Sequence, residues 1–181
     1  MIVKPFPETT TERTMALTVR SWRPSDAGAF RAVVTANMRH LDVFPWPSDS
    51  LDERVEQIRR NASRVTYSLG VFKADEIVGE VEANRNDDGS FTLFYWLAES
   101  ATGKGYALAA VSAVVMVLFD LTDTEVLRAS VERDNARSLK LLHALAFCRL
   151  GKDTLPSHDE YVLTRHAYTG GVLLPPKERP R

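Results

Sequence analysis

The sequence predicts an α+β (mixed α/β) domain built around one sheet, and three observations support this class. Segments with strand-like alternation and segments with helical spacing interleave along the chain, and three consecutive strands lie near its middle. The composition, 44% hydrophobic and 26% charged, is typical of a globular chain. The length of 181 residues suffices for one domain with a hydrophobic core.

The predicted elements follow from spacing and from turn residues. Apolar residues recur every three or four positions in the helices and every second position in the strands. Short polar turns between consecutive strands indicate antiparallel hairpins. In chain order the predicted elements are a strand at 15–22, helices at 25–38 and 50–62, strands at 65–73, 77–84 and 90–98, a helix at 106–121, a strand at 124–131, a helix at 134–145 and a hairpin of strands at 147–150 and 160–165.

The same spacing assigns residues to the core and to the surface. Cys148 is expected in the core and His143 on the surface. Residues 1–14 are expected to form a flexible N-terminus, residues 15–167 the domain, and residues 168–181 a Gly/Pro-rich tail without regular structure. The helical positions expected to face the core are Phe30, Val33, Val34, Met38, Val55, Ile58, Leu139, Leu142 and Leu145.

Charge and cysteine content exclude several classes of protein. The formal net charge of −1 gives no electrostatic attraction to nucleic acid or to a membrane, so neither is expected as a partner. The single cysteine rules out an intramolecular disulfide and a CxxC metal site, and no metal is expected. The N-terminus has no apolar signal segment, so a cytoplasmic location is expected. The apolar run Tyr106–Leu121 has 16 residues, fewer than the roughly 20 of a membrane span, and is expected to be a helix buried on all sides.

The segment that leads into this apolar helix predicts an anion-binding site. A buried strand is followed by a short loop at 99–104, with Gly103 and Gly105 at its end. Glycine lets the backbone turn tightly and approach a ligand. The first N–H groups of a helix have no partner inside it and lie at the positive end of its dipole. We therefore expect a phosphate or pyrophosphate here.

Two other phosphate-binding motifs do not fit this loop. A dinucleotide-binding Rossmann motif would need a third small residue at Leu108 and an early βαβ unit, and both are absent. A P-loop would need Ser or Thr directly after Gly-Lys, where the chain has Gly105.

Four motifs lie in a fixed order along residues 16–166. They are Arg20-Ser21-Trp22-Arg23-Pro24-Ser25-Asp26-Ala27; His40-Leu41 with Pro45-Trp46; Tyr95-Trp96-Leu97 with Gly103-Lys104-Gly105-Tyr106-Ala107; and Asn135-Ala136-Arg137-Ser138 through Phe147. Together they resemble the GNAT N-acetyltransferases, and within them the RimJ/RimL-type branch of ribosomal-protein N-acetyltransferases. The resemblance implies a central, mostly antiparallel and splayed sheet of six or seven strands flanked by about four helices.

The chain departs from this family's pattern at several positions. Ser100 replaces an Arg or Gln before the first glycine, and Ala109 replaces a Glu in the helix. Ala146 replaces a Gly, which would cost on the order of 1 kcal/mol if that position needs a positive φ. The tyrosine with which many relatives protonate the leaving thiolate falls at Leu142. This branch often uses a serine instead, and Ser138 occupies its place.

The resemblance implies that acetyl-CoA is the cosubstrate. Its pyrophosphate would lie on N–H groups of the glycine loop, and its pantetheine amides would pair with the backbone near Ala98. Asn135 would bond the arm, although this residue can also be read as a helix cap. The implied cosubstrate-binding residues are Leu97, Ala98, Thr102, Gly103, Lys104, Gly105, Tyr106, Ala107, Asn135 and Ser138.

Transfer to an amine requires a base, or a water chain, for the ammonium proton and a donor for the thiolate. Ser138 is the expected donor. Residue types leave the base open: Glu82 and Glu80 are the first candidates, and His40 and Asp42 the second. Glu80 and Glu82 could instead form a solvated face or an ion pair, and Trp46 could fill the core. The residues expected on the acceptor side are His40, Trp46, Glu80 and Tyr95.

Two functions remain open at this point. The first is an N-acetyltransferase that transfers acetyl directly to a primary amine, either a protein N-terminus or a small molecule. The second is a non-catalytic acyl-CoA-binding domain that senses or scaffolds, because the tyrosine and the glutamate are missing at Leu142 and Ala109. The expected partners are acetyl-CoA and the amine acceptor, and a homodimer is also considered.

Overall fold

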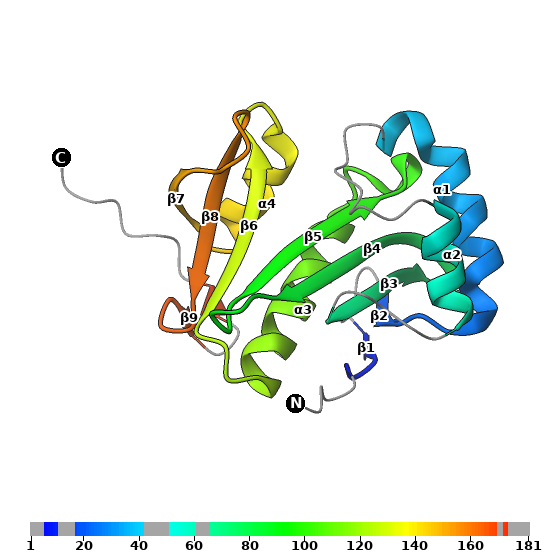
Figure 1. The fold of residues 1–181 in the computed structure, drawn as a ribbon, viewed down its shortest axis with the longest axis horizontal. Helices are drawn as coiled ribbons and strands as arrows, with labels where there is room; N and C mark the ends of the chain where they lie inside the picture. The colour runs from blue at the N-terminus through cyan, green and yellow to red at the C-terminus, as the bar shows by residue number, and fades with distance from the viewer. Residues whose placement is uncertain (1–5, 11–16, 42–50, 61–65, 170–171, 174–181) are drawn as a thin grey trace. The chain divides into compact units, whose positions relative to one another are not determined.

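The structure is a computed structural model that describes residues 6–10, 17–41, 51–60, 66–169 and 172–173 (Figure 1). Its helices and strands confirm the predicted interleaving. In chain order they are β1 (Thr9–Thr10), β2 (Leu17–Ser21), the 3₁₀ turn η1 (Pro24–Asp26), α1 (Ala27–Leu41), α2 (Leu51–Arg59), β3 (Tyr67–Lys73), β4 (Glu76–Arg85), β5 (Phe91–Leu97), the 3₁₀ turn η2 (Glu99–Ala101), α3 (Tyr106–Leu121), β6 (Val126–Glu132), α4 (Ala136–Ala144), β7 (Cys148–Lys152), β8 (His158–Thr164), β9 (Tyr168–Thr169) and β10 (Val172–Leu173).

Eight of the described strands form one open sheet in the order β1-β2-β3-β4-β5-β6-β8-β7. Pairs β1–β2, β2–β3, β3–β4, β6–β8 and β7–β8 are antiparallel, and β5–β6 is parallel. A parallel pair needs a crossover connection, which α3 supplies between β5 and β6. The predicted mixed class with a mostly antiparallel sheet and four helices is confirmed. The short strand β1 brings the sheet to one strand more than the six or seven expected.

The chain forms two compact units, and each is described by itself. The first comprises residues 1–83 and 94–114, and the second residues 84–93 and 115–181. Strands β4 and β5 and helix α3 contribute residues to both units.

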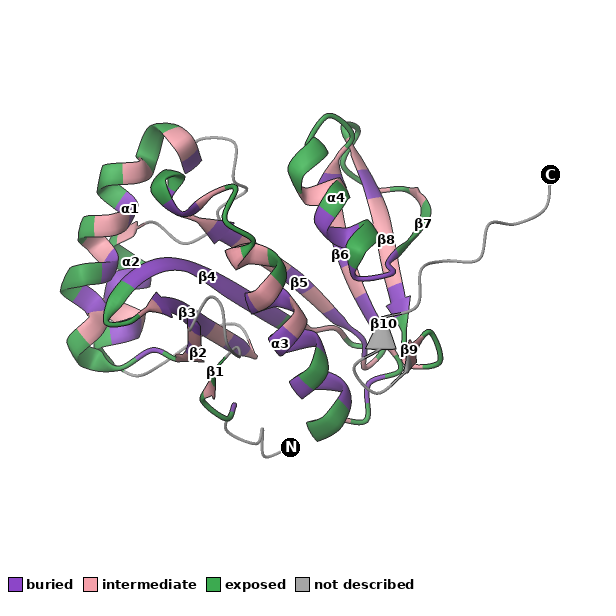
Figure 2. Cartoon of the chain, turned by 180° about the vertical axis from the view of Figure 1, so that it is seen from behind, coloured by how far each residue is buried: buried purple, intermediate pink, exposed green. Residues whose placement is uncertain are grey.

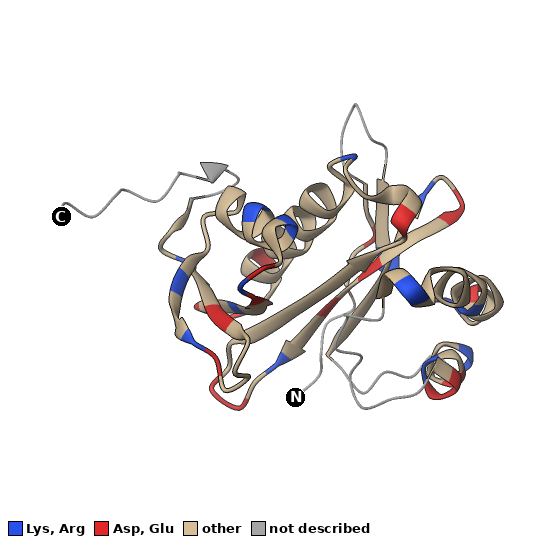
Figure 3. Ribbon diagram, turned by 90° about the horizontal axis from the view of Figure 1, so that it is seen from above, with Lys and Arg blue, Asp and Glu red and all other residues tan. Residues whose placement is uncertain are grey.

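In the first unit, an apolar cluster joins α1 and α2 to the sheet. The ring of Trp22 meets those of Phe30 and Phe72 edge to face, with centroids 5.1 and 5.7 Å apart. Figure 2 shows β4 buried over most of its length. Helix α2 carries charges of both signs, whereas α1 carries arginines and no acidic residue (Figure 3), and Arg31 of α1 pairs with Asp52 of α2. The buried members of the cluster are Trp22, Ala27, Phe30, Val34, Leu41, Val55, Ile58, Phe72, Ile77 and Trp96.

Most helical core positions in this unit were predicted correctly, but Met38 was not. Phe30, Val34, Val55 and Ile58 are buried, and Val33 packs against the cluster. Met38 is 54% exposed. The buried stripe of α1 passes through its neighbour Asn37, whose side chain bonds the backbone at Val33 and Glu99.

The N-terminal segment is more ordered than expected. Thr9 and Thr10 pair with Val19 and Thr18 of β2. The buried ring of Phe6 meets the ring of Tyr67 edge to face at 5.6 Å. Residues 6–10 therefore make contacts with the sheet that were not predicted from the sequence.

In the second unit, α4 and the β7–β8 hairpin differ from the expected burial. Leu142 and Leu145 are buried as predicted and His143 is exposed, but Leu139 is only half-buried. Cys148 is exposed, which contradicts the core position predicted for it. It opens β7, the edge strand of the sheet, whose first three residues are all exposed. Phe147 fills the core position instead.

Helix α3 has the predicted bounds, but it is not buried on all sides. Leu108, Met116 and Leu121 are each more than a third exposed. Arg165 supplies donors near the C-terminal end of α3, bonding the carbonyl oxygens of Phe119 in its last turn and of Thr122 just after it at 2.6 and 2.8 Å. None of the helices among the described residues is both long and apolar enough to cross a membrane.

The start of the C-terminal tail has regular structure that was not expected. Thr169 and Tyr168 pair with Val172 and Leu173 as an antiparallel ladder. The ring of Tyr168 stacks on that of Phe119 with centroids 4.9 Å apart. A Gly-Gly dipeptide between two short strands is a hairpin signal, and Gly170-Gly171 carries it in the sequence.

Two alanines adopt the left-handed conformation that favours glycine. Ala74 has φ of 52° in the exposed β3–β4 turn, and Ala146 has φ of 60° directly after α4. The positive φ anticipated for Ala146 is therefore present, and its side chain is buried.

We expect Ala74→Gly to raise the free energy of unfolding by about 1 kcal/mol, because glycine adopts positive φ without steric conflict. Ala146→Gly should raise it by less, because a buried methyl group worth about 0.8 kcal/mol is lost. Urea denaturation of both variants checks this. A gain at Ala146 as large as that at Ala74 would contradict it.

In the second unit, the carboxylate of Asp159 lies between two arginines. It is buried and accepts from Arg149 Nε at 2.6 Å and from Arg133 Nε at 3.1 Å. The hydrogen bond from Arg149, supported by Arg133, lowers the pKa of this carboxyl from 3.8 to about 2.

Because the folded-state pKa of Asp159 is lowered, its contribution to stability is present above about pH 4 and is lost as the pH falls toward 2. The difference in unfolding free energy between wild type and Asp159→Asn should therefore shrink across this range. Urea denaturation at pH 7, 5, 4 and 3 measures it. Asp75→Asn, in the exposed β3–β4 turn, is the control, and a constant difference for Asp159 would refute the assignment.

Candidate active site

The predicted anion loop has the backbone geometry that it requires. The 3₁₀ turn η2 follows β5, and the hydroxyl of Thr102 donates to the carbonyl of Glu99 at 2.8 Å. Gly103 and Gly105 have φ of 71° and 78°, which L side chains rarely adopt. The carbonyl of Gly105 accepts the first helical bond, from the N–H of Ala109 at 3.1 Å. The N–H groups at the start of α3 therefore have no acceptor within the helix.

Positive charge gathers at this end of α3. The helix dipole contributes there, and Lys104 is exposed in the turn itself. The ammonium of Lys73, at the end of β3, lies 5.9 Å from the ring centroid of Tyr106, the first residue of α3. Lys73 was not predicted, although its place at the end of a strand before a hairpin was visible in the sequence. The arrangement can bind a phosphate group.

The segment expected to bind the pantetheine arm is the end of β5. Leu97 is half-buried and Ala98 is buried. The N–H of Ala98 donates to the carbonyl of Val78 at 2.9 Å, so β4 holds this end of the strand in place.

A buried charge cluster lies on β4 in the first unit. Glu80 and Glu82 are 2% and 5% exposed, and both pair with Arg54 of α2, which is 3% exposed. Two carboxylates and one guanidinium leave a formal charge of −1. Burying these charges is tolerated because the guanidinium lies against both carboxylates.

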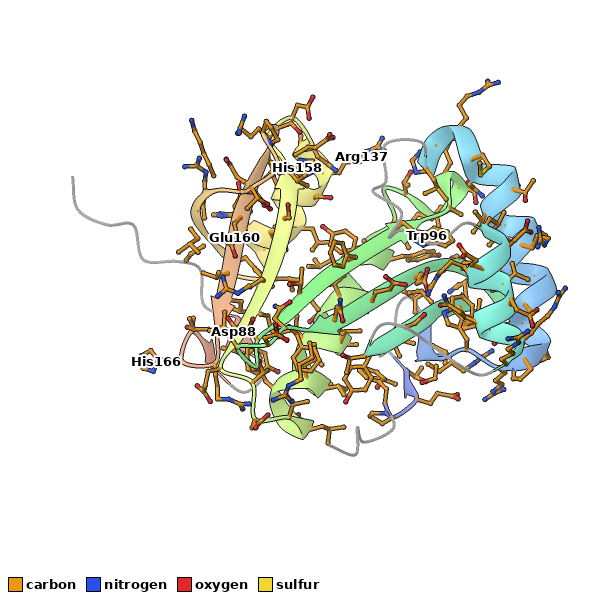
Figure 4. All side chains as sticks on the ribbon, in the orientation of Figure 1. Asp88, Trp96, Arg137, His158, Glu160 and His166 are labelled. Atoms are coloured by element: carbon orange, nitrogen blue, oxygen red, sulfur yellow. The ribbon has the colours of Figure 1, made fainter. Side chains whose placement is uncertain are left out.

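Glu80 is saturated by donors in addition to Arg54. Its Oε1 accepts from Trp22 Nε1 at 3.1 Å and from the hydroxyl of Ser68 at 2.9 Å. Its Oε2 accepts from Trp96 Nε1 at 3.0 Å, and Figure 4 shows Trp96 on β5. Glu80 and Glu82 both form the ion pair with Arg54 that was the alternative to a base role.

Of the other residues predicted for the acceptor side or as a base, the structure describes two. His40 lies half-buried in the last turn of α1, and Tyr95 lies half-buried on β5. Trp46 and Asp42 fall outside the described residues.

In the second unit, Asn135 and Ser138 lie together on the first turn of α4. The Asn135 side chain accepts from the N–H of Ser138 at 3.1 Å, so Asn135 is the N-cap of this helix. Asn135 is thus a helix cap, as the alternative interpretation of this residue predicted, and its side-chain oxygen makes the capping bond. Ser138 is half-buried.

Sequence reasoning missed the residues that hold the site in shape. Arg54, Ser68 and Asn37 were not singled out, because charged and polar residues in helices and strands are usually solvent-facing. One signal was available for Arg54. It lies four residues before Ile58 on α2 and so shares the buried face of that helix.

The family of the chain follows from its comparison with known proteins. Residues 16–147 match the family described as "Acetyltransferase (GNAT) domain". The chain belongs to the GNAT acetyltransferases. An uncharacterized N-acetyltransferase p20 from Bacillus licheniformis is 32% identical over 119 residues, which are 62% of this chain and 67% of that protein. The chain is accordingly an N-acetyltransferase.

Solved structures of RimJ/RimL-type enzymes share the fold. Mycobacterium smegmatis RimJ in complex with a CoA-disulfide gives a TM-score of 0.73 at 20% identity, covering 86% of each chain. The ribosomal-protein-S5-alanine acetyltransferase from Vibrio fischeri gives 0.69 at 22% identity, covering 90% of this chain and 100% of that one.

Replacing Arg54 by Met should lower the free energy of unfolding by about 3–5 kcal/mol, because it leaves two buried carboxylates without a counter-charge. Urea denaturation at pH 7 measures the change. Arg59→Met is the matched control on the same helix, because Arg59 is exposed and pairs only weakly with Glu56; its effect should stay within about 0.5 kcal/mol. Equal effects of the two substitutions would contradict the role of Arg54 as the counter-charge of the two buried carboxylates.

Proposed function

We propose that this acetyltransferase moves an acetyl group from acetyl-CoA directly to a primary amine. The observation that carries the proposal is the left-handed turn at Gly103 and Gly105, which opens α3 directly after β5. It offers a row of N–H groups, the helix dipole and the nearby cations Lys73 and Lys104 to a pyrophosphate. The similar M. smegmatis RimJ is described in complex with a CoA-disulfide, which supports CoA as the ligand.

The residues proposed to hold acetyl-CoA act through backbone and polar groups. N–H groups from Gly103 to Ala107 would bind the pyrophosphate, whereas the N–H of Thr102 already donates to the carbonyl of Glu99 at 3.1 Å. The backbone at Leu97 and Ala98 would pair with the pantetheine amides. The side-chain oxygen of Asn135 caps α4, so its NH₂ group is the part that we assign to the arm.

Acetyl-CoA supplies a thioester whose carbonyl carbon the neutral amine attacks. The C–N bond forms as the C–S bond breaks, and the thiolate must gain a proton. We assign that step to the hydroxyl of Ser138, which gives its proton to the sulfur and takes one from the attacking nitrogen as the amide forms. The ammonium of the acceptor must first lose a proton, and we assign it to Glu82 acting through water, because Glu82 is buried. The donors around Glu80 support a structural role for that carboxylate.

For the acceptor we favour the N-terminal amine of a protein over a small molecule. The similar Vibrio fischeri structure is described as a ribosomal-protein-S5-alanine acetyltransferase. His40, Trp46 and Tyr95 are the residues that we propose for the acceptor side. A single cysteine suits a reducing compartment, and we propose the cytoplasm as its location.

The proposal predicts thiol release from acetyl-CoA in the presence of an amine. Ser138→Ala should lower kcat on the order of 100-fold, because it removes the proton donor. Its Kd for CoA, measured by calorimetry, should stay within about two-fold of the wild-type value, since the N–H groups of the loop are untouched. A panel of N-terminal peptides and small amines identifies the acceptor class.

Lys140→Ala, at an exposed position of the same helix, is the control and should leave turnover unchanged. Unchanged turnover in Ser138→Ala would remove this residue from the mechanism. Tight CoA binding by the wild type without turnover on any amine would favour the sensor alternative, for which the buried, hydroxyl-free Leu142 is the supporting observation.

A further inference from the structure

We propose that Gly79, Glu80 and Asn37 are positioning residues for acetyl-CoA. They fix the end of β5 and the turn after it, residues 96–99, from three directions. All three belong to the first unit, as does the segment that they hold. The inference rests on the proposed function, since residues 97 and 98 are the proposed site of the pantetheine arm.

The first direction is a close backbone approach at Gly79. A Cβ atom on this residue would lie 2.3 Å from the carbonyl oxygen of Trp96 and 3.1 Å from the Cα atom of Leu97. Contacts under 3.0 Å to backbone cannot be relieved by rotating a side chain, so any larger residue would displace β5. Glycine here sets how closely β4 and β5 approach.

An irregularity in β4 accompanies this approach. Gly79 pairs with Val71 and Ile77 pairs with Phe72, so Val78 is an extra residue in the β3–β4 ladder. The carbonyl of this extra residue accepts from the N–H of Ala98 at 2.9 Å. The extra residue of β4 is therefore hydrogen-bonded to Ala98, one of the two residues proposed to bind the pantetheine arm.

The second direction is the side chain of Trp96. Its indole N–H donates to Glu80 Oε2 at 3.0 Å, and its buried ring packs in the apolar cluster of the first unit. Arg54 and Ser68 hold the other oxygen of Glu80, so the carboxylate cannot turn away from the indole without breaking those bonds. Glu80 thus anchors Trp96, and with it the backbone of Leu97.

The third direction is α1. The side-chain oxygen of Asn37 accepts from the N–H of Glu99 at 2.8 Å, and its NH₂ group donates to the carbonyl of Val33 at 2.8 Å. Two opposed bonds fix the orientation of the amide. Asn37 therefore holds the first residue of η2, immediately after Ala98.

These contacts predict an effect on ligand affinity beyond any effect on stability. Hydrogen bonds to a ligand weaken steeply with distance and angle, and a misplacement of about 1 Å can reduce activity on the order of 100-fold. A residue that only supports the fold would lower the melting temperature without changing the affinity of the protein that remains folded.

The test compares two glycines of the same sheet. Gly79→Ala should weaken CoA binding about 10-fold or more, as measured by calorimetry at a temperature where circular dichroism shows each variant folded. Gly70→Ala is the matched control. The three atoms nearest to its Cβ would be side-chain atoms of Phe72 and Trp22 at 2.5–2.8 Å, none of which belongs to β5. It should lower Tm while keeping the Kd for CoA within about two-fold. Gly28→Ala, with nothing within 4 Å, should leave the Kd for CoA unchanged and should not lower Tm, because alanine favours a helix more than glycine does.

Asn37 gives a second test that does not depend on core packing. Asn37→Ala should raise the Kd for CoA about five-fold, and Asn37→Asp should recover part of the loss, because a carboxylate still accepts from Glu99. Thr35→Ala, exposed on the same helix, is the control. Equal Kd values for Asn37→Ala and Thr35→Ala would remove Asn37 from the proposal.

The outcomes separate this inference from the function on which it rests. If the wild type does not bind CoA, the proposed function fails. If the wild type binds CoA and Gly79→Ala binds as well as Gly70→Ala does, only the positioning role is overturned.

Discussion

Arg54 carries a full positive charge into the interior of the first unit, where water cannot solvate it. Such a group is tolerated only if opposite charges lie against it, and Glu80 and Glu82 do so. The requirement ties α2 to β4. Through Glu80 it extends to Trp22 of the β2–α1 connection and to Trp96 of β5. One buried charge thereby helps to position α2, β4, the β2–α1 connection and β5 around the end of β5, where acetyl-CoA is proposed to bind.

The sequence predicted the elements that depend on periodicity and on glycine. Helix α3 has the predicted bounds, and Gly103 and Gly105 have the positive φ values that the anion loop needs. These features are local, because apolar spacing and the missing Cβ of glycine act within a few residues. The candidate CoA loop could therefore be read from the sequence.

Features that depend on tertiary contacts were not predictable. The spacing of α1 favours Met38 as a core residue, but Met38 is exposed and its half-buried neighbour Asn37 turns inward to a bond partner 62 residues away. Cys148 has the composition of a core residue, yet it opens an edge strand. The sequence offered Glu80 and Glu82 as candidates for the base, but it could not indicate the donors that reach Glu80 from distant segments. Partners separated along the chain leave no periodic signal.

The two ends of α3 differ in how their backbone groups are satisfied. At the C-terminal end the guanidinium of Arg165 bonds the carbonyls of Phe119 and Thr122, so that the protein itself supplies donors there. The first N–H groups at the other end have no acceptor within the helix. Under the proposed function, acetyl-CoA supplies those acceptors and acts as the N-cap of α3. Cosubstrate binding and stability would then be linked, and protection against unfolding would rise with the logarithm of the acetyl-CoA concentration.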